Sequence, residues 1–137
     1  MRRHLAILKR LYLDAILEGK KTIEARLTKT KRQPFGQIDV GDFVYLKRSS
    51  GSICATARVA AVKTYENLTR LEIGKIKKLY NKEICGNQSY WQSKSDCSYA
   101  LLIWLEDVKK ISAVNISKKD QRAWVVLSKS LNYGLKY

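Results

Sequence analysis

The sequence predicts an α+β fold, a small and mainly antiparallel β-barrel of about six strands with two or three flanking helices. Short β-rich segments follow one another with turn residues between them, instead of alternating regularly with helices as in a doubly wound sheet. Two other segments have the apolar spacing of helices. Apolar residues make up 45% of the 137 residues, which is enough for a core without disulfides or a metal.

The first elements are expected to be a strand, a short helix and a second strand. Residues 4–9 have an apolar, strand-like composition, and residues 11–17 present a broad apolar face at helical spacing. Gly19 follows where a left-handed residue most easily ends a helix. Residues 22–27 then alternate between polar and apolar side chains, which predicts a strand.

A β-hairpin is expected in the middle of the chain. The single proline, Pro34, lies in a segment that reads as a loop, residues 33–36. The β-rich segments 43–46 and 53–63 are separated by the turn-like Ser-Ser-Gly-Ser at 49–52. This arrangement predicts two antiparallel strands.

The second half of the chain contributes further strands and a longer helix. Residues 68–79 have helical spacing, with lysines expected on the exposed face. The polar residues 81–96 contain either another short helix or a loop. The apolar segment 99–105 is expected to be a central strand, 109–116 a strand or turn leading to the sheet edge, and 123–127 the final strand.

We expect one domain, residues 1–137, with a core at about 5–127 and a peripheral C-terminal tail at 128–137. No apolar run approaches the roughly 18–20 residues of a membrane span, and the basic N-terminus lacks the pattern of a signal peptide. These features predict a cytoplasmic protein without a membrane partner.

Neither a metal nor a cofactor is expected. The three cysteines, Cys54, Cys85 and Cys97, form no C-x-x-C pair, and the single histidine, His4, is distant from them in sequence. Reduced thiols are therefore the simplest interpretation. The single histidine also excludes a histidine-pair ribonuclease mechanism and makes a serine or cysteine triad improbable.

The net charge points to an anionic partner. The chain carries 27 basic and 12 acidic side chains, a formal charge of +15, and the excess is spread over both halves. Because such a charge repels itself in a compact protein, we favour a nucleic acid as partner. A lysine-rich but partnerless surface and an anionic membrane surface are the alternatives.

Residues 19–26, Gly-Lys-Lys-Thr-Ile-Glu-Ala-Arg, fit the pattern G-x-K-x-x-E-x-R. An Ile-Leu-x-Gly helix end at 16–19 overlaps the start of this pattern. A Gly-Asp-x-Val-x-Leu segment at 41–46 and the apolar Tyr-Ala-Leu-Leu-Ile-Trp-Leu-Glu-Asp-Val at 99–108 follow it. In motif, order and length, residues 5–127 resemble the ASCH domain family.

The resemblance implies a PUA-like β-barrel with helices beside a cleft, and an RNA ligand by fold analogy with other PUA-like domains. Some members are similar to ribonucleases. One bacterial branch hydrolyses N4-acetylcytidine with the motif lysine, a threonine at the position of Glu24 and a distant glutamate. This chain keeps the lysine as Lys21 but departs from that branch at Glu24, and Glu72 or Glu83 are candidates for the distant glutamate.

The motif strand is expected to have one polar and one apolar face. Thr22, Glu24 and Arg26 would share the polar face, with Ile23 and Ala25 in the core. Lys21 would extend toward the same opening from the helix–strand junction. A Glu24–Arg26 pair would aim the arginine at a phosphate, and Glu24 could accept from a base amino group. The alternative is a purely structural Glu24–Arg26 ion pair that fixes a strand edge.

Further binding residues are expected outside this motif. Residues 20–32 carry six basic and one acidic side chain, a plausible phosphate track. The aromatic pair at 90–91 would stack on single-stranded bases or, equally well, cap the barrel. The predicted nucleic-acid-binding residues are Lys20, Lys21, Thr22, Glu24, Arg26, Lys29, Lys31, Arg32, Tyr90 and Trp91.

Three functions are consistent with these residues. The first is binding of RNA or a modified nucleotide in a basic cleft around Lys21, Glu24 and Arg26. The second is hydrolysis of RNA or an acylated cytosine nucleoside, with Lys21 and Glu24 as the catalytic proton handlers. Lys21 would act as a base only if burial or Lys20 lowered its pKa. The third is a basic adaptor for acidic proteins.

Overall fold

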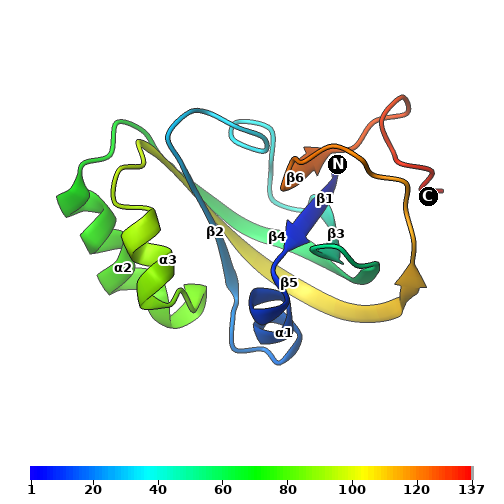
Figure 1. The fold of residues 1–137 in the computed structure, drawn as a ribbon, viewed down its shortest axis with the longest axis horizontal. Coiled ribbons are helices and arrows are strands. Elements are labelled where there is room, and N and C mark those ends of the chain that lie inside the picture. The colour runs from blue at the N-terminus through cyan, green and yellow to red at the C-terminus, as the bar shows by residue number, and fades with distance from the viewer. Residues whose placement is uncertain (137) are drawn as a thin grey trace.

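The computed structural model describes residues 1–136, and this part of the chain contains one curled sheet of six strands and three helices (Figure 1). The strands are β1 (Arg3–Leu8), β2 (Ile23–Thr28), β3 (Phe43–Arg48), β4 (Ile53–Tyr65), β5 (Tyr99–Val114) and β6 (Trp124–Val126). The helices are α1 (Arg10–Leu17), α2 (Arg70–Ile84) and α3 (Gln88–Ser93).

The sheet is mixed but mainly antiparallel, in the strand order β2-β5-β4-β3-β1-β6. Only β1 and β3 pair in parallel, with Ile7 opposite Lys47, and the other four neighbouring pairs are antiparallel. The parallel pair arises because α1 and β2 lie between β1 and β3 in the sequence. The predicted α+β class is confirmed, and the parallel pair is the one departure from an antiparallel sheet.

The sheet curls into a half-barrel whose two ends, β2 and β6, do not pair with each other. The gap between these two end strands is here called the seam, and the side chain of Arg26 crosses it. Arg26 on β2 donates from Nη1 to the carbonyl of Ala123 (3.3 Å) and from Nη2 to the carbonyl of Ile7 (3.3 Å). A single side chain therefore ties β2 to β1 and to the segment just before β6.

Apolar side chains form three clusters around the sheet. The first fills the inside of the half-barrel, where Leu13 and Ile16 of α1 pack with β3, β4 and β5. The second lies between the β2–β5 end of the sheet and the helices α2 and α3 (Figure 1). The third covers β1 and β6 with the C-terminal segment. The helices and the C-terminal segment thereby stand on opposite sides of the seam.

The helix α2 begins with a capping box. The side chain of Thr69 accepts from the backbone N–H of Glu72 (3.2 Å), and the Glu72 carboxylate accepts from the backbone N–H of Thr69 (3.0 Å). The helix runs five residues past the predicted 68–79, and Leu71 and Leu79, expected on its apolar face, are 71% and 69% exposed. Among residues 1–136, no helix is both long and apolar enough to cross a membrane.

Residues 99–105 form part of a central strand, as predicted, and residues 109–114 are strand as well. Both segments belong to one strand, β5, whose ladder continues past Asp107, a residue in a left-handed conformation (φ 52°). The described part of the predicted tail, residues 128–136, packs on the protein. Leu135 is buried with Leu5 of β1, because the outer face of β1 needs an apolar cover; Tyr137 lies outside the described residues.

A buried histidine fixes the floor of the half-barrel. Trp124 Nε1 donates to His4 Nδ1 (3.0 Å), so the ring proton of the neutral imidazole lies on Nε2, which donates to Asp42 Oδ2 (2.8 Å). Burial lowers the pKa of His4 and outweighs the opposing effect of the Asp42 carboxylate. His4 is therefore a structural residue that holds Trp124 in place.

This burial predicts a pH dependence of stability. His4 is the single histidine, and no other side chain has an ordinary pKa between pH 5.5 and 7. Because the pKa of His4 is lowered in the folded state, the unfolded state takes up the proton first as the pH falls through 6.5. The free energy of unfolding should fall from pH 7.5 to 5.5 by at most about 1.4 kcal/mol per pH unit, as measured by urea denaturation.

The matched variant is His4→Gln, whose side chain does not titrate. It should be less stable than the wild type at pH 7.5, with a flat profile down to pH 5.5. A wild-type stability that stays constant or rises as the pH falls would contradict the buried neutral histidine.

Candidate functional site

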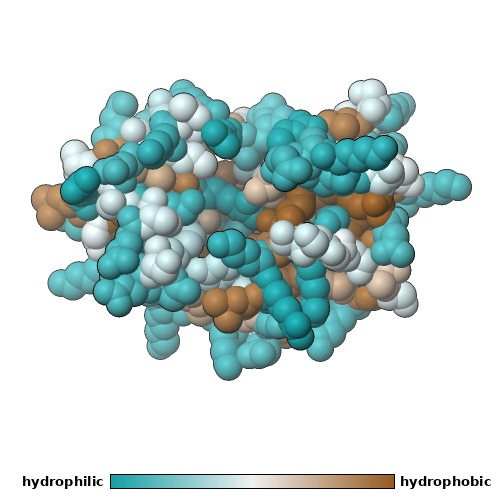
Figure 2. Space-filling model, in the orientation of Figure 1, coloured by the Kyte–Doolittle hydropathy of each residue, from teal (hydrophilic) through white to brown (hydrophobic). Residues whose placement is uncertain are grey.

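A cleft of about 1140 Å³ opens beside the seam of the half-barrel. Its walls come from α1, β2, α3, the turn after β3 and the segment 118–124. In Figure 1, β2 lies between the helices α2 and α3 on one side and the strands β1 and β6 on the other. Figure 2 shows this face as mostly hydrophilic, with a smaller hydrophobic area right of centre.

Three charged side chains of the motif meet at the base of the cleft. The Glu24 carboxylate pairs with Lys21 through Oε1 (3.2 Å) and with Arg26 through Oε2 (2.7 Å). The side chains of Lys21, Glu24 and Arg26 are 2%, 8% and 18% exposed. Glu24 and Arg26 share one face of β2, as the sequence predicts, whereas Ile23 and Ala25 pack in the second core cluster.

Lys21 joins the strand to the end of α2. Its Nζ donates to the carbonyls of Ile23 (2.7 Å) and Ile84 (2.7 Å), besides its contact with Glu24. All three ammonium hydrogens therefore have an acceptor. With this set of partners Lys21 is a fixed cation that positions Glu24 and holds β2 against α2.

Glu24 is a buried but ionised carboxylate. Burial by itself raises its pKa, but Arg26 and Lys21, through their charges and hydrogen bonds, more than offset this, so the pKa of Glu24 lies below its ordinary value. At neutral pH the cluster thus combines one carboxylate with two cations. Glu24 is a hydrogen-bond acceptor there and has no proton to donate.

Arg26 rests on an aromatic ring. Its guanidinium carbon lies 5.1 Å from the centre of the Trp124 ring, a distance that permits a cation–π interaction. Trp124 is in turn held by His4. A continuous set of contacts therefore runs from Asp42 through His4, Trp124 and Arg26 to Glu24.

Two tyrosines line the cleft beside this cluster. The ring of Tyr12 on α1 lies 5.4 Å from Lys21 Nζ and contacts the Tyr90 ring edge to face at 5.9 Å. Tyr90 on α3 donates from its hydroxyl to the carbonyl of Ala25 (3.1 Å). The close approach of α3 depends on Gly86, where a Cβ would lie 2.8 Å from Tyr90 Cδ2.

The cleft wall is strongly positive, with eight basic and two acidic side chains. Four of the basic side chains form no ion pair with any carboxylate of residues 1–136: Lys9, Arg32, Lys47 and Lys94. The second acidic residue, Asp120, is already shared within the wall. Uncompensated positive charge therefore faces the cleft.

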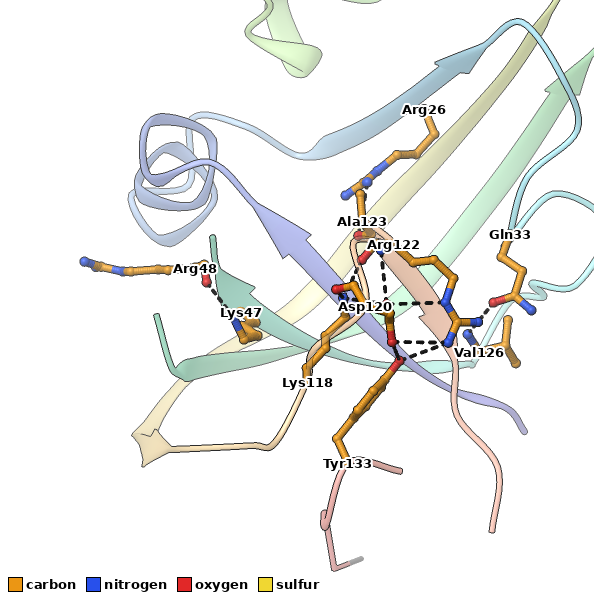
Figure 3. Close-up of polar contacts among 10 residues, drawn as sticks. All are labelled: Arg26, Gln33, Lys47, Arg48, Lys118, Asp120, Arg122, Ala123, Val126 and Tyr133. Carbon is orange, nitrogen blue, oxygen red and sulfur yellow. Dashed lines mark hydrogen bonds and ion pairs between the residues drawn. The ribbon is translucent and has the colours of Figure 1, made fainter. Parts of the chain in front are cut away.

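The wall opposite the helices is a polar network of the C-terminal segment (Figure 3). Lys118 Nζ donates to the carboxylate of Asp120 (2.9 Å), its carbonyl (2.8 Å) and the carbonyl of Arg122 (2.8 Å). Asp120 also accepts from the hydroxyl of Tyr133 (2.6 Å) and pairs with Arg122 (3.3 Å). These hydrogen bonds, above all that from Tyr133, lower the pKa of Asp120, so the loop is fixed by an ionised carboxylate.

Several predicted site residues lie elsewhere. Lys20, Thr22, Lys29 and Lys31 do not line the cleft; Lys20 pairs with Glu18 (3.0 Å) and Lys31 with Glu66 (2.8 Å). Thr22 lies just before β2. Its backbone N–H donates to the carbonyl of Glu83 (3.0 Å), its carbonyl accepts from the N–H of Leu105 (3.0 Å), and its side chain is exposed.

Trp91 is also outside the cleft wall. It is 5% exposed and donates from Nε1 to Asn81 Oδ1 (2.9 Å) in the second core cluster, so its ring cannot stack on a base. Of the predicted residues, Lys21, Glu24, Arg26, Arg32 and Tyr90 do meet in the cleft. The two candidates for a distant glutamate, Glu72 and Glu83, do not line it.

Comparison with known proteins identifies the family. A family model described as the ASCH domain matches residues 7–109. The chain belongs to the ASCH domain family. In this ASCH domain the match covers the charged cluster and both tyrosines, whereas Lys118 and Arg122 lie beyond it.

Solved structures agree with the fold. The ASCH protein of Zymomonas mobilis has a TM-score of 0.73 at 16% identity, covering 93% of this chain and 89% of that one. A variant of that protein with one tyrosine replaced by phenylalanine has a TM-score of 0.74 at 16% identity, covering 95% and 93%. No curated protein sequence matches.

Sequence analysis missed part of the cleft wall of this ASCH domain. Lys9, Lys47, Lys118 and Arg122 were not predicted, because β-pairing and the return of the C-terminal segment bring them together. Tyr12 was not predicted either, although a polar aromatic residue on the helix before the motif is a local signal. Within residues 1–136, no group of three or more His, Cys, Asp or Glu side chains is placed to hold a metal.

The buried cluster predicts a large stability loss for Glu24→Gln. The change would leave Lys21 and Arg26 without their shared carboxylate, and removing one partner of a buried pair typically costs about 3–5 kcal/mol. Urea denaturation at pH 7 measures this loss. Since the pKa of Glu24 is lowered, this stabilisation is present above pH 4.5 and is lost as the pH falls through the folded-state pKa.

The control is Glu18→Gln, which removes the exposed partner of Lys20. Its stability should match the wild type, because an exposed pair contributes little. Equal effects of Glu18→Gln and Glu24→Gln would contradict the assignment of a buried structural cluster.

Proposed function

We propose that this ASCH domain binds RNA, or a modified nucleotide, in the cleft around Lys21, Glu24 and Arg26. The observation that carries the proposal is the convergence, in one cleft, of uncompensated cations and half-buried tyrosine rings. Phosphates are bound by the cations and bases by aromatic faces, and single-stranded RNA presents both groups.

The cluster at the base of the cleft supports recognition of a base. Glu24 is ionised, and each of its oxygens retains acceptor capacity beyond its one cation. A carboxylate of this kind can accept from an exocyclic amino group, as acidic side chains do with cytosine. Tyr12 and Tyr90 stand beside it to contact the face or edge of the ring.

The geometry favours binding over the hydrolase alternative. A general base needs a free lone pair, but Lys21 Nζ donates to two carbonyls and a carboxylate. Neither glutamate candidate for the distant position reaches the cleft. An RNA ligand, together with three free cysteines, also fits the cytoplasm as the compartment, which we include in the proposal.

The first experiment measures fluorescence anisotropy of labelled single-stranded RNA over a salt series. The test variant is Arg32→Gln/Lys94→Gln, since neither side chain has a carboxylate partner to lose among residues 1–136. For this variant, the slope of log K for RNA association against log salt concentration should be less steep than for the wild type by about 1.4. Each lost phosphate contact removes about 0.7 from the slope on single strands.

The charge-matched control is Lys75→Gln/Lys78→Gln on the exposed face of α2, which does not line the cleft. Its slope should stay closer to the wild type. Absence of RNA binding at moderate salt, or equal slopes for the two double variants, would overturn the proposal. A gel of the RNA afterwards separates binding from cleavage, and shortened RNA would favour the hydrolase.

A second prediction concerns stacking. Tyr12→Leu keeps an apolar side chain but removes the aromatic face, and one stacked base contributes about 1–3 kcal/mol. RNA affinity should fall about tenfold at constant salt, with an unchanged salt slope because no charge is lost. Tyr65→Leu, at a half-buried tyrosine outside the cleft, is the control, and an equal loss there would show that Tyr12 makes no specific contact.

A further inference from the structure

We propose that the end of the cleft formed by Lys9, Lys47, Ser49 and Lys118 is a phosphate subsite, so that the ligand is phosphorylated rather than a free nucleoside. This inference rests on the proposed function and names the class of ligand more closely. The shared chemistry is a phosphate group, which either a nucleotide or an RNA backbone can supply.

Long-range pairing brings these four residues together. In the parallel β1–β3 ladder Ile7 lies opposite Lys47. One step further, the backbone N–H of Ser49 donates to the carbonyl of Leu8 (2.8 Å), which places the turn after β3 beside Lys9. The C-terminal segment then returns over this edge with Lys118, as Figure 3 shows for Lys47 and Lys118. All four residues line the cleft.

Lys47 and Lys118 are neighbouring cations at this end, and Lys47 has no carboxylate partner among residues 1–136. Lys47 is half-buried, and its Nζ donates to the carbonyl of Arg48 (3.1 Å) but pairs with no carboxylate of the described chain. Burial, and secondarily the charge of Lys118, lower the pKa of Lys47. An anionic ligand would relieve both effects, because it supplies a hydrogen-bond acceptor to Lys47 and opposite charge to both neighbouring cations.

The nearby carboxylate does not fill this role. Asp120 is occupied by Lys118, Arg122 and the hydroxyl of Tyr133, so two cations share one carboxylate. Lys118 is 7% exposed and cannot swing away, since three oxygens hold its Nζ. Its charge is therefore fixed in the wall, whereas exposed Lys9 and the Ser49 hydroxyl are free to close on a ligand.

Arg26 connects the charged cluster to the strand beside the subsite. Arg26 reaches from Glu24 to the carbonyl of Ile7, and Ile7 is the ladder partner of Lys47. A ligand with its base beside Tyr12 and Glu24 would thus extend past Arg26 toward Lys47. A free nucleoside carries no group that uses these cations, whereas a 5′-phosphate or the next phosphate of an RNA strand does.

The test compares matched ligands on the wild type and on Lys9→Gln/Lys47→Gln. Neither lysine has a carboxylate partner among residues 1–136. Calorimetry with the four ribonucleoside 5′-monophosphates and their nucleosides should show about tenfold tighter binding of the preferred monophosphate to the wild type. In the variant, the dissociation constants of the monophosphate and of its nucleoside should differ by no more than about twofold, and that of the nucleoside should equal the wild-type value.

A second arm uses single-stranded RNA over a salt series. The slope should flatten by about 1.4 in Lys9→Gln/Lys47→Gln, but not in the charge-matched Lys75→Gln/Lys78→Gln. If the variant loses both the preference for the monophosphate and part of the RNA salt slope, the subsite accepts a terminal phosphate. Loss in the RNA arm alone, with no measurable monophosphate binding, identifies a backbone phosphate.

The outcomes separate the two proposals. If the wild type binds RNA and Arg32→Gln/Lys94→Gln weakens it, but Lys9→Gln/Lys47→Gln leaves the salt slope and any preference for a monophosphate unchanged, the subsite is wrong and the cleft proposal stands. If the wild type binds neither RNA nor nucleotides, both are wrong. The thermal unfolding temperature of each variant should match that of the wild type within a few degrees, which shows that a change in binding does not come from a loss of folding.

Discussion

The buried contact of one carboxylate with two cations, Glu24 with Lys21 and Arg26, organises this molecule. Lys21 connects β2 to the end of α2, and Arg26 connects β2 to β1 and to the segment before β6. Neither cation could be buried at low cost without the carboxylate between them. The cluster therefore joins the helical side and the C-terminal side of a sheet whose end strands do not pair.

The seam explains why a cleft exists at this place. A closed barrel would satisfy β2 and β6 with backbone hydrogen bonds and fill its mouth with side chains. Here the long polar side chain of Arg26 spans the gap, and the space beside it stays open and positively charged. His4 and Asp42 support this arrangement from the core through Trp124, which carries Arg26 on its ring. Stability and the proposed ligand binding thus use the same few groups.

Local patterns predicted most elements and the charged cluster at the base of the candidate site, and missed what long-range pairing creates. The period-two alternation after Gly19 placed Glu24 and Arg26 together on one strand face. No local pattern could pair β1 with β3 in parallel or bring Lys118 beside Lys47. Trp91 was misplaced because its polar neighbours hide its burial under α2. Residues 109–116 were predicted as a separate strand or turn, because the exposed second half of β5 lacks the apolar run of its first half.

The most direct test of a nucleic-acid-binding cleft is an NMR titration of labelled protein with single-stranded RNA. RNA bound in the cleft should produce the largest shifts in the backbone amides of Tyr12, Arg26, Ser49 and Tyr90 and in the indole N–H of Trp124, all at or beneath the cleft. Shifts confined to the exposed lysine face of α2 or to the outer half of β5, with the cleft signals unmoved, would contradict binding in the cleft.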